Sequence, residues 1–182
     1  MFRRISFALI SVLIALFFIA CSRTAAPAGS PAQGPATSVK FVKASAADVQ
    51  ISAGGSAEAT VTLTIQPGYH VNANPPTFPY LRATEVLVQT VEGVSVGFIT
   101  YPNPLTKKFS FADKPLAVYE GSAAIKVTLK ATPTAAKGAR SLPAKLNVQA
   151  CDDQVCFTPQ SVPLTWTIGL RALDRDRANP GK

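Results

Sequence analysis

Apolar and polar side chains alternate with a period of two along several stretches of this chain, and this period restricts the fold more than any other feature. Residues 57–66 show it most clearly: alanine, valine, leucine and isoleucine occupy every second position, with glutamate, threonine and glutamine between them. Successive side chains of a β-strand point to opposite faces of its sheet, so this stretch predicts a strand buried on one face. The same alternation returns at residues 125–130, 145–150 and 162–168.

Shorter apolar runs add further strands to this pattern. They lie at residues 39–42, 49–51, 85–91 and 94–101, and turn-forming pairs such as Gly54-Gly55 and Pro67-Gly68 separate them. Seven or eight short strands without a sustained helical period predict an all-β fold, an immunoglobulin-like antiparallel β-sandwich. Proline has no backbone N–H to donate, so Pro163 predicts an edge position for the last of these strands.

The N-terminus has the form of a bacterial signal peptide of the lipoprotein type. Arg3 and Arg4 precede an unbroken apolar run over residues 5–20, and a cysteine, Cys21, follows Ala20. The ending Phe-Ile-Ala-Cys resembles a lipobox, so residues 1–20 are expected to be removed and Cys21 to carry lipid. Ordinary secretion and an uncleaved anchor are the alternatives. In each case the domain lies outside the cytoplasm, where disulfides persist.

Composition divides the remainder of the chain into three parts. Residues 21–38 consist almost entirely of Ala, Pro, Gly, Ser and Thr and are expected to form a flexible linker. Residues 39–170 have the length of one domain with its own core, and residues 171–182 form a polar tail. The formal net charge is +8, but the lysines are scattered and no cluster of basic and aromatic residues is present. We therefore expect no nucleic-acid partner.

Cys151 and Cys156 are the two cysteines that remain for chemistry if Cys21 is lipidated. An extended strand would separate them by about 16 Å, whereas a disulfide requires about 4.4 to 6.8 Å between Cα atoms. If they pair, the chain must reverse over residues 152–155, and the bond closes a hairpin. A loop of about six residues contributes only about 2 kcal/mol to stability.

The neighbours of these cysteines do not favour a reactive thiolate. No helix N-terminus follows to lower a thiol pKa, and Asp152 and Asp153 disfavour the thiolate by like-charge repulsion. The spacing also differs from the Cys-x-x-Cys motif of thioredoxin-like proteins. We therefore expect a pair that is attacked by the activated thiol of a partner and does not itself start the exchange.

Three segments of the domain resemble those of one protein family. They are Gly68-Tyr69-His70-Val71-Asn72, the segment from Phe109-Ser110-Phe111 to Val118-Tyr119-Glu120-Gly121, and the segment from Gln149 through both cysteines to Pro159. Together they are similar to the N-terminal periplasmic domains of the thiol:disulfide interchange protein DsbD, over about residues 39–168. The cysteine turn with its following proline is the most specific part of the resemblance.

This resemblance implies an immunoglobulin-like fold in which Cys151 and Cys156 are the redox pair. In the family, the pair takes electrons from a thioredoxin-like domain and passes them to periplasmic disulfide isomerases and cytochrome c maturation proteins. An aromatic cap loop shields the pair until a partner docks, and Phe109 or Phe111 would be the cap here. The family's transmembrane and thioredoxin-like domains do not follow in this sequence, so a separate thioredoxin-like domain or membrane thiol reductase is the expected donor.

Tyr69, His70, Asp152 and Asp153 are the possible neighbours of the cysteine pair. We interpret His70, the only histidine, as a hydrogen-bonded surface residue after the Pro67-Gly68 turn. The alternative is a proton donor or electrostatic partner beside the disulfide. Together with the two cysteines it offers three metal ligands, whereas a closed structural zinc site normally has four. We expect no metal and no cofactor.

The aromatic residues of the domain also admit more than one interpretation. Phe109 and Phe111 alternate around Ser110, so strand packing would place both on one face. The charged residues Lys107-Lys108 before them and Asp113-Lys114-Pro115 after them indicate an exposed loop instead. Tyr119 is expected in the core or at an interface. Trp166, in an alternating stretch, is expected in the core.

The sequence thus predicts a thiol-disulfide exchange domain, a protein-disulfide reductase type component held at the periplasmic side of a membrane by its lipid. One competing hypothesis is a non-catalytic immunoglobulin-like binding or structural lipoprotein with an inert hairpin disulfide. Another is an accessory subunit that docks on a membrane reductase without carrying electrons. No Ser/His/Asp arrangement and no glycine-rich phosphate loop points to another chemistry.

Overall fold

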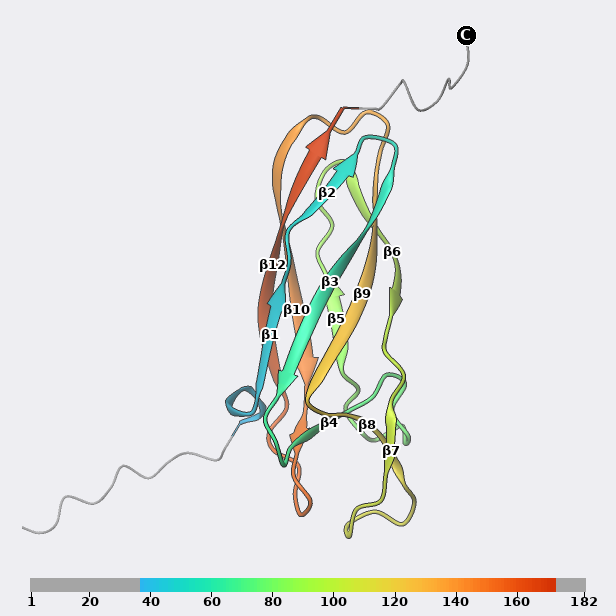
Figure 1. Ribbon diagram of the computed structural model, residues 1–182, viewed down its shortest axis with the longest axis vertical. Helices are drawn as coiled ribbons and strands as arrows, with labels where there is room; N and C mark the ends of the chain where they lie inside the picture. Colours follow the sequence, from blue (N-terminus) through green and yellow to red (C-terminus); the bar gives the residue numbers. More distant parts are fainter. Residues whose placement is uncertain (1–36, 173–182) are drawn as a thin grey trace, which may run out of the picture. The chain divides into compact units, whose positions relative to one another are not determined.

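Two four-stranded β-sheets face each other in the computed structural model of the chain, which describes residues 37–172 (Figure 1). The first sheet has the order β1-β3-β9-β6, made of β1 (Val42–Ala46), β3 (Ser56–Ile65), β9 (Ser122–Ala131) and β6 (Val94–Thr100). The second has the order β2-β12-β10-β5, made of β2 (Val49–Ser52), β12 (Gln160–Arg171), β10 (Gly138–Val148) and β5 (Glu85–Val88). This is the predicted all-β, immunoglobulin-like sandwich.

A third, smaller sheet lies at one end of the sandwich, at the bottom of Figure 1. Its order is β11-β4-β8-β7, made of β11 (Ala150–Cys151), β4 (His70–Asn72), β8 (Leu116–Tyr119) and β7 (Leu105–Lys107). Its strands are two to four residues long, and β11 follows the end of β10 after one residue. Because β11 and β4 contain Cys151 and His70, this sheet positions the candidate site.

The alternating stretches of the sequence form the long strands of the sandwich. The four predicted stretches correspond to β3, β9, β10 and β12, with the last residue of the third, Ala150, in β11, and the runs at residues 49–51, 85–91 and 94–101 correspond to β2, β5 and β6. The run at residues 39–42 differs from its prediction, because Ser38–Lys40 form a 3-10 turn and β1 begins only at Val42. The structure describes twelve strands in residues 37–172 where seven or eight were expected, and the additional strands are the short ones.

The core fills the space between the two large sheets with the apolar sides of the alternating strands. Trp166 of β12 is fully buried, as predicted, and its indole N–H donates a hydrogen bond to the carbonyl oxygen of Thr60 in β3 at 3.3 Å. This bond connects the two sheets, because β12 and β3 belong to different ones. The other largest side chains with less than 2% exposure in this core are Ile51, Val61, Leu63, Val71, Ile125, Leu129, Leu142, Leu146 and Ile168.

Strand β12 corrects the prediction made from Pro163. We expected an edge strand, but β12 lies between β2 and β10. The parallel pairing with β2 covers only the last part of β12, from Ile168 to Arg171, whereas the antiparallel pairing with β10 includes Pro163 opposite Lys145. The proline is therefore tolerated where β12 has a ladder on one side only. The β2–β12 pair is a parallel exception in an otherwise antiparallel sandwich.

The ends of the described part of the chain differ by a few residues from the composition boundaries. Thr37 forms an isolated bridge with Thr158, Ser38 is buried, and Arg171 pairs with Ser52 at the end of β12. The predicted signal peptide, the lipidation site Cys21, most of the linker and most of the tail lie outside the described residues. No helix within residues 37–172 has both the length and the hydropathy of a membrane span.

Candidate functional site

A disulfide bond joins Cys151 and Cys156 across a tight hairpin, with the Cα atoms 3.9 Å apart. The two cysteines form an antiparallel bridge, and the amide of Asp152 donates a hydrogen bond to the carbonyl oxygen of Val155 at 2.9 Å. The chain therefore reverses over residues 152–155, as the cysteine spacing predicts for a bonded pair. Cys156 does not open the next strand, because β12 begins four residues later at Gln160.

The carboxylate of Asp152 shapes this cysteine turn, by which we mean residues 152–155. Its Oδ1 accepts hydrogen bonds from the amides of Gln154 and Val155, both at 2.8 Å. These bonds stabilise the ionised form and lower the pKa of the Asp152 carboxyl group. Asp152 thus builds the turn, whereas the exposed Asp153 adds charge beside it.

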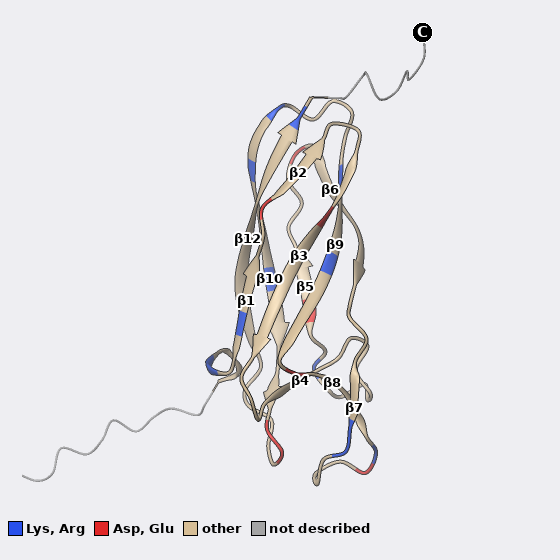
Figure 2. Cartoon of the chain, viewed as in Figure 1, with Lys and Arg blue, Asp and Glu red and all other residues tan. Residues whose placement is uncertain are grey.

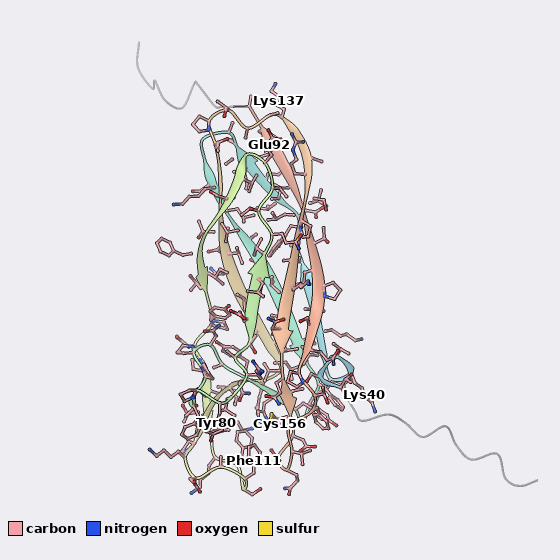
Figure 3. All side chains as sticks on the ribbon, turned by 180° about the vertical axis from the view of Figure 1, so that it is seen from behind. Lys40, Tyr80, Glu92, Phe111, Lys137 and Cys156 are labelled. Atoms are coloured by element: carbon pink, nitrogen blue, oxygen red, sulfur yellow. A yellow bond between two sulfur atoms is a disulfide. The ribbon has the colours of Figure 1, made fainter. Side chains whose placement is uncertain are left out.

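The two cysteines differ sharply in exposure. Cys151 ends β11 and is 1% exposed, whereas Cys156 lies in the exposed half of the hairpin. Figure 3 shows Cys156 at the same end of the sandwich as Phe111 and Tyr80, with Glu92 and Lys137 at the other end. A dissolved thiol or a partner protein therefore has access to the Cys156 side of the bond.

The register of the small sheet brings His70 to the disulfide. Cys151 of β11 lies directly opposite His70 of β4 in an antiparallel pair, so both side chains lie on one face of the sheet. His70 is 1% exposed, so its interpretation as a surface histidine is wrong. The reason is that residues 70–72 form a strand that is buried at every position, which no alternation in the sequence reveals.

An aromatic stack covers this face of β4. The ring of Phe109 stacks on the imidazole of His70 with centroids 4.1 Å apart, and the ring of Phe111 stacks on Phe109 at 5.4 Å. Phe109 is 5% exposed, whereas Phe111 is 42% exposed. Both belong to the loop between β7 and β8, so they do not pack as alternate residues of a strand.

This loop contacts the cysteine turn through Ser110, whose hydroxyl donates a hydrogen bond to the carbonyl oxygen of Asp153 at 3.2 Å. Below it, Phe109 packs with Leu116 and Val118 of β8 in a small apolar cluster separate from the main core. We refer to residues 108–115 as the cap loop. The loop is therefore connected to the disulfide hairpin by one exposed hydrogen bond and rests on a cluster of its own.

Charged groups surround the buried imidazole. Figure 2 shows acidic residues in the cysteine turn and basic residues along β7 and the start of the cap loop. Lys107 forms an exposed ion pair with Glu120 at 2.7 Å. Burial lowers the pKa of His70, with a smaller contribution in the same direction from Lys107, while Glu120, Asp153 and Asp152 oppose the shift. The imidazole is therefore neutral at neutral pH.

Three buried polar atoms have no hydrogen-bond partner among the described residues: His70 Nε2, Asn72 Oδ1 and Thr84 Oγ1. His70 and Asn72 are two residues apart on β4, so their side chains share a face. The amide of Thr84 donates a hydrogen bond to the carbonyl oxygen of Asn72 at 3.2 Å. Buried polar groups without a partner are uncommon, so these three atoms are unusual features of the end of the domain that holds the disulfide.

Tyr69 belongs to a second aromatic cluster. Its ring stacks on Phe41 at 3.9 Å and lies 5.9 Å from the ring of Phe157, which follows Cys156 directly. Tyr119 is buried, and its hydroxyl accepts a hydrogen bond from the amide of Asn74 at 3.1 Å. Tyr69 thus supports the hairpin from the side of Phe157, and Tyr119 has a structural role.

Sequence reasoning did not identify Ser38, which fastens the hairpin to the start of the domain. Its hydroxyl donates to the carbonyl oxygen of Thr158 at 2.7 Å and accepts from the amide of Ala150 at 2.9 Å. A serine at the end of a linker rich in Ser, Ala and Pro carries no distinguishing signal. Ser110 and Glu120 were noted in the sequence only as parts of motifs.

The fold and this site define a class of protein: an immunoglobulin-like β-sandwich domain with a disulfide-closed hairpin and an aromatic loop at one end. The model of the family described as "Thiol:disulfide interchange protein DsbD, N-terminal" matches residues 38–165. The chain belongs to this family, as the resemblance in its sequence predicted. It is thus a thiol-disulfide exchange domain, and thiol-disulfide redox proteins are its partners in general.

Solved structures similar to this chain include the N-terminal domains of two bacterial proteins and a cohesin. The N-terminal domain of Neisseria meningitidis DsbD in the reduced form is 17% identical, with 69% of this chain and 82% of that chain covered and a TM-score of 0.45. The N-terminal periplasmic domain of ScsB from Proteus mirabilis is 20% identical, with 68% of this chain and 44% of that chain covered and a TM-score of 0.46. A ScaB type I cohesin from Pseudobacteroides cellulosolvens is 12% identical, with 72% and 93% covered and a TM-score of 0.44. No curated protein matches the chain.

Proposed function

We propose that this domain relays electrons in the periplasm through the Cys151–Cys156 pair. The donor is a thioredoxin-like domain or a membrane thiol reductase, and the acceptors are oxidised envelope proteins such as a disulfide isomerase or a cytochrome c maturation protein. The observation that carries the proposal is a hairpin disulfide with one exposed and one buried cysteine in a member of the DsbD N-terminal family. In enzymatic terms the domain is one component of a protein-disulfide reductase.

The exposure of the two cysteines supports a different role for each sulfur in the exchange. The donor thiolate attacks the sulfur of Cys156, the Cys151–Cys156 bond breaks, and its electron pair stays on the sulfur of Cys151. The second thiol of the donor then attacks the donor sulfur in the mixed disulfide. The donor leaves with a disulfide, and both cysteines of the domain are reduced. The same steps in reverse reduce a client disulfide.

The loop containing Phe109, Ser110 and Phe111 acts as the cap of this pair. Two observations support this role: Phe109 of the loop stacks on His70, and Ser110 of the loop is hydrogen-bonded to Asp153. Together these contacts hold the loop against the hairpin. The cap opens further when a partner docks and closes again afterwards, which slows the reaction of the pair with unrelated molecules in solution although Cys156 itself is exposed. Phe109 is the inner part of the cap and Phe111 the outer part.

Exposed apolar side chains at the disulfide end suit contact with a redox partner. Val155 in the cysteine turn is 54% exposed, Phe111 is 42% exposed and Tyr80 is 77% exposed. Thiol exchange requires the partner's sulfur to reach Cys156, so the docking surface is continuous with this end. We assign it to a thioredoxin-like partner, because such a partner must present its reactive thiol next to the exposed side of the bond.

The midpoint potential of the Cys151–Cys156 pair is the first test. Protein lacking residues 1–20 is equilibrated in redox buffers, alkylated and analysed by mass spectrometry. A potential above about −250 mV lies in the range of exchange-active couples and supports the electron relay. A potential below about −300 mV indicates a structural clip and favours an inert binding or structural lipoprotein.

Single replacements Cys151→Ser and Cys156→Ser test the order of attack. With Cys156 as the attacked sulfur, the Cys151→Ser variant retains the exposed thiol and accumulates a mixed disulfide with its donor or client. The Cys156→Ser variant should trap little, because Cys151 is buried. Equal trapping by both variants would contradict the assignment. Binding that survives loss of both thiols, without any exchange, would favour the accessory-subunit hypothesis.

We also propose that Cys21 carries lipid and that residues 22–36 tether the domain to the periplasmic side of a membrane. The support for this proposal is the signal-peptide pattern of residues 1–20. Metabolic labelling with a fatty acid tests it, with Cys21→Ser as the control that loses the label. Release of the unlabelled wild-type protein into the soluble periplasmic fraction would indicate ordinary secretion instead.

A further inference from the structure

We propose that His70 is the general base that deprotonates the buried thiol of Cys151 when the reduced pair closes again into a disulfide. This inference rests on the proposed electron relay and adds a residue to it. In the relay, Cys156 first forms a mixed disulfide with the client, and Cys151 must then attack the sulfur of Cys156. A thiol reacts only as its thiolate, so the buried Cys151 needs a group that accepts its proton.

The position of His70 satisfies the first requirement for such a base, which is proximity. His70 and Cys151 are directly opposite in the antiparallel pair of β4 and β11. The Cβ atoms of opposite residues in such pairs lie about 4.5–5.5 Å apart, with both side chains on the same face. An imidazole at this position can reach the sulfur of Cys151 within the side-chain lengths of the two residues.

The second requirement is that water does not easily take the proton from the thiol of Cys151. Both His70 and Cys151 are 1% exposed, and Phe109 covers the imidazole with a centroid distance of 4.1 Å. Burial in apolar surroundings raises the pKa of a thiol, so Cys151 is a poor nucleophile without help.

The third requirement is a free nitrogen in the basic form. Nε2 of His70 has no hydrogen-bond partner among residues 37–172, so it is not committed to a structural bond. Four charged groups influence the imidazole: Glu120 after β8, Lys107 at the end of β7, and Asp152 and Asp153 of the cysteine turn. The net effect of burial and these charges keeps the pKa of His70 below its ordinary value, so the imidazole is neutral and able to accept a proton.

In the closing step, atoms and electrons are conserved. The imidazole takes the proton from the sulfur of Cys151, and the resulting thiolate attacks the sulfur of Cys156. The Cys151–Cys156 bond forms, the bond from Cys156 to the client sulfur breaks, and its electron pair leaves on the client sulfur. The pair in the domain is oxidised by two electrons and the client is reduced. The imidazolium returns its proton to the departing thiolate or to solvent.

Stopped-flow reaction of the reduced protein with Ellman's reagent isolates this step. The reagent first forms a mixed disulfide with Cys156 and releases one thionitrobenzoate, and attack by Cys151 then releases a second. We expect the rate of the second phase to rise with pH through the pKa of His70. In the His70→Gln variant that dependence is lost and the phase slows by roughly 100-fold, the usual size of general-base catalysis. An unchanged rate and pH profile in this variant would overturn the proposal.

Two control variants separate proton transfer from packing. Asn72→Ala changes a buried polar residue on the same face of β4 without removing a titratable group, so the second phase should keep its pH dependence. Phe109→Leu removes the ring stacked on His70 but keeps the imidazole, so it should speed the first phase and keep a pH dependence of the second that is shifted toward the ordinary pKa of histidine. Loss of the dependence in either control would assign the effect to packing and overturn the role of His70.

Because His70 is the only histidine, NMR can follow its ring protons in the unaltered sequence, purified without a histidine tag. We expect the ring signals of the reduced protein to show a second titration step that coincides with ionisation of the Cys151 thiol, and the oxidised protein to lack it. Identical titrations in both redox states would overturn the proposal even if His70→Gln fails to fold. If the disulfide does not exchange with any dithiol, both the electron relay and the role of His70 are contradicted. If it exchanges with a pH profile that does not depend on His70, only the role of His70 is contradicted.

Discussion

Ser38 shows how much a single buried hydroxyl contributes to the position of the disulfide hairpin. It is fully buried and satisfies the amide of Ala150 and the carbonyl oxygen of Thr158, on the two arms of the hairpin. The Ser38→Ala variant leaves the buried amide of Ala150 without a partner. We expect the free energy of unfolding to fall by about 1–3 kcal/mol, measured by urea denaturation.

Ser141→Ala is the matched control for this substitution. Ser141 is an exposed serine in β10, and its hydroxyl makes no hydrogen bond within the described part of the chain. Its replacement should change the free energy of unfolding by less than about 0.5 kcal/mol. A loss of the same size in both variants would mean that the bonds of Ser38 add nothing to stability.

Individual residues were predicted well where one chemical property decided their position. Cys151 and Cys156 could be placed on a hairpin because the length of a disulfide excludes an extended chain between them. Trp166 could be placed in the core from its alternating stretch. His70 could not be placed correctly, because its burial depends on Phe109, which is distant in sequence and lies on the loop between β7 and β8.

At the scale of elements, the disulfide hairpin is expected to be a small contributor to stability. The bond closes a short loop, since the cysteines are 5 positions apart. The chain-entropy estimate for such a loop is about 2 kcal/mol. We expect reduction to lower the free energy of unfolding by about this amount while the sandwich stays folded, as measured by urea denaturation with and without a phosphine reductant. Complete unfolding on reduction would assign the bond a structural role.

The cap loop and the cysteine turn are connected by one hydrogen bond, from Ser110 to Asp153. In the Ser110→Ala variant the loop should open more often, because a net hydrogen bond contributes about 0.5–1.5 kcal/mol. We expect the disulfide to be reduced by dithiothreitol up to about tenfold faster, while the midpoint potential stays unchanged.

Ser56→Ala, an exposed replacement in β3, is the control for the cap variant and should react at the wild-type rate. An unchanged rate in Ser110→Ala would show that the aromatic stack alone holds the loop. A changed midpoint potential would show that the bond acts on the disulfide itself and not on access to it.

The long strands were predictable and the short ones were not. Each of the long strands β3, β9, β10 and β12 has one buried and one exposed face. Apolar and polar residues therefore alternate along their sequences with a period of two. β4 is buried at all three positions and β7 is exposed at all three, so neither shows a period. The third sheet therefore could not be predicted from an alternation of apolar and polar residues, although it contains the candidate site.

At the scale of the whole molecule, His70 couples stability to pH. Burial is the main cause of its lowered pKa, and in the unfolded chain the pKa returns to about 6.5. The unfolded state thus binds more protons below this pH, so stability is complete above about 6.5 and falls as the pH approaches the pKa of the folded protein. We expect a lower urea midpoint at about pH 5 than at about pH 7.5, with a smaller difference in His70→Gln. An equal difference in both proteins would contradict this prediction.

Asp152 changes stability in the same direction over a more acidic range. Hydrogen bonds from Val155 and Gln154 lower the pKa of its carboxyl group below the ordinary 3.8. The stability that these bonds add is present above that value and is lost as the pH falls through the folded pKa. The two effects are separable, because the His70→Gln variant removes only the contribution of the imidazole.

The class of fold, the turn required by a bond between Cys151 and Cys156, and the family of this protein could all be predicted without a structure. Periodicity, residue size and short motifs are local properties, so they can be read without knowing which strands meet. The pairing of β4 with β11 could be found only from the folded chain, and it places His70 opposite Cys151 and beneath Phe109. These residues come from three separate parts of the chain, and their contact depends on strand pairing and loop packing over long distances in sequence. The alternation of apolar and polar residues thus predicts the fold. The environment of the disulfide instead arises from the pairing of short strands, which do not show this alternation.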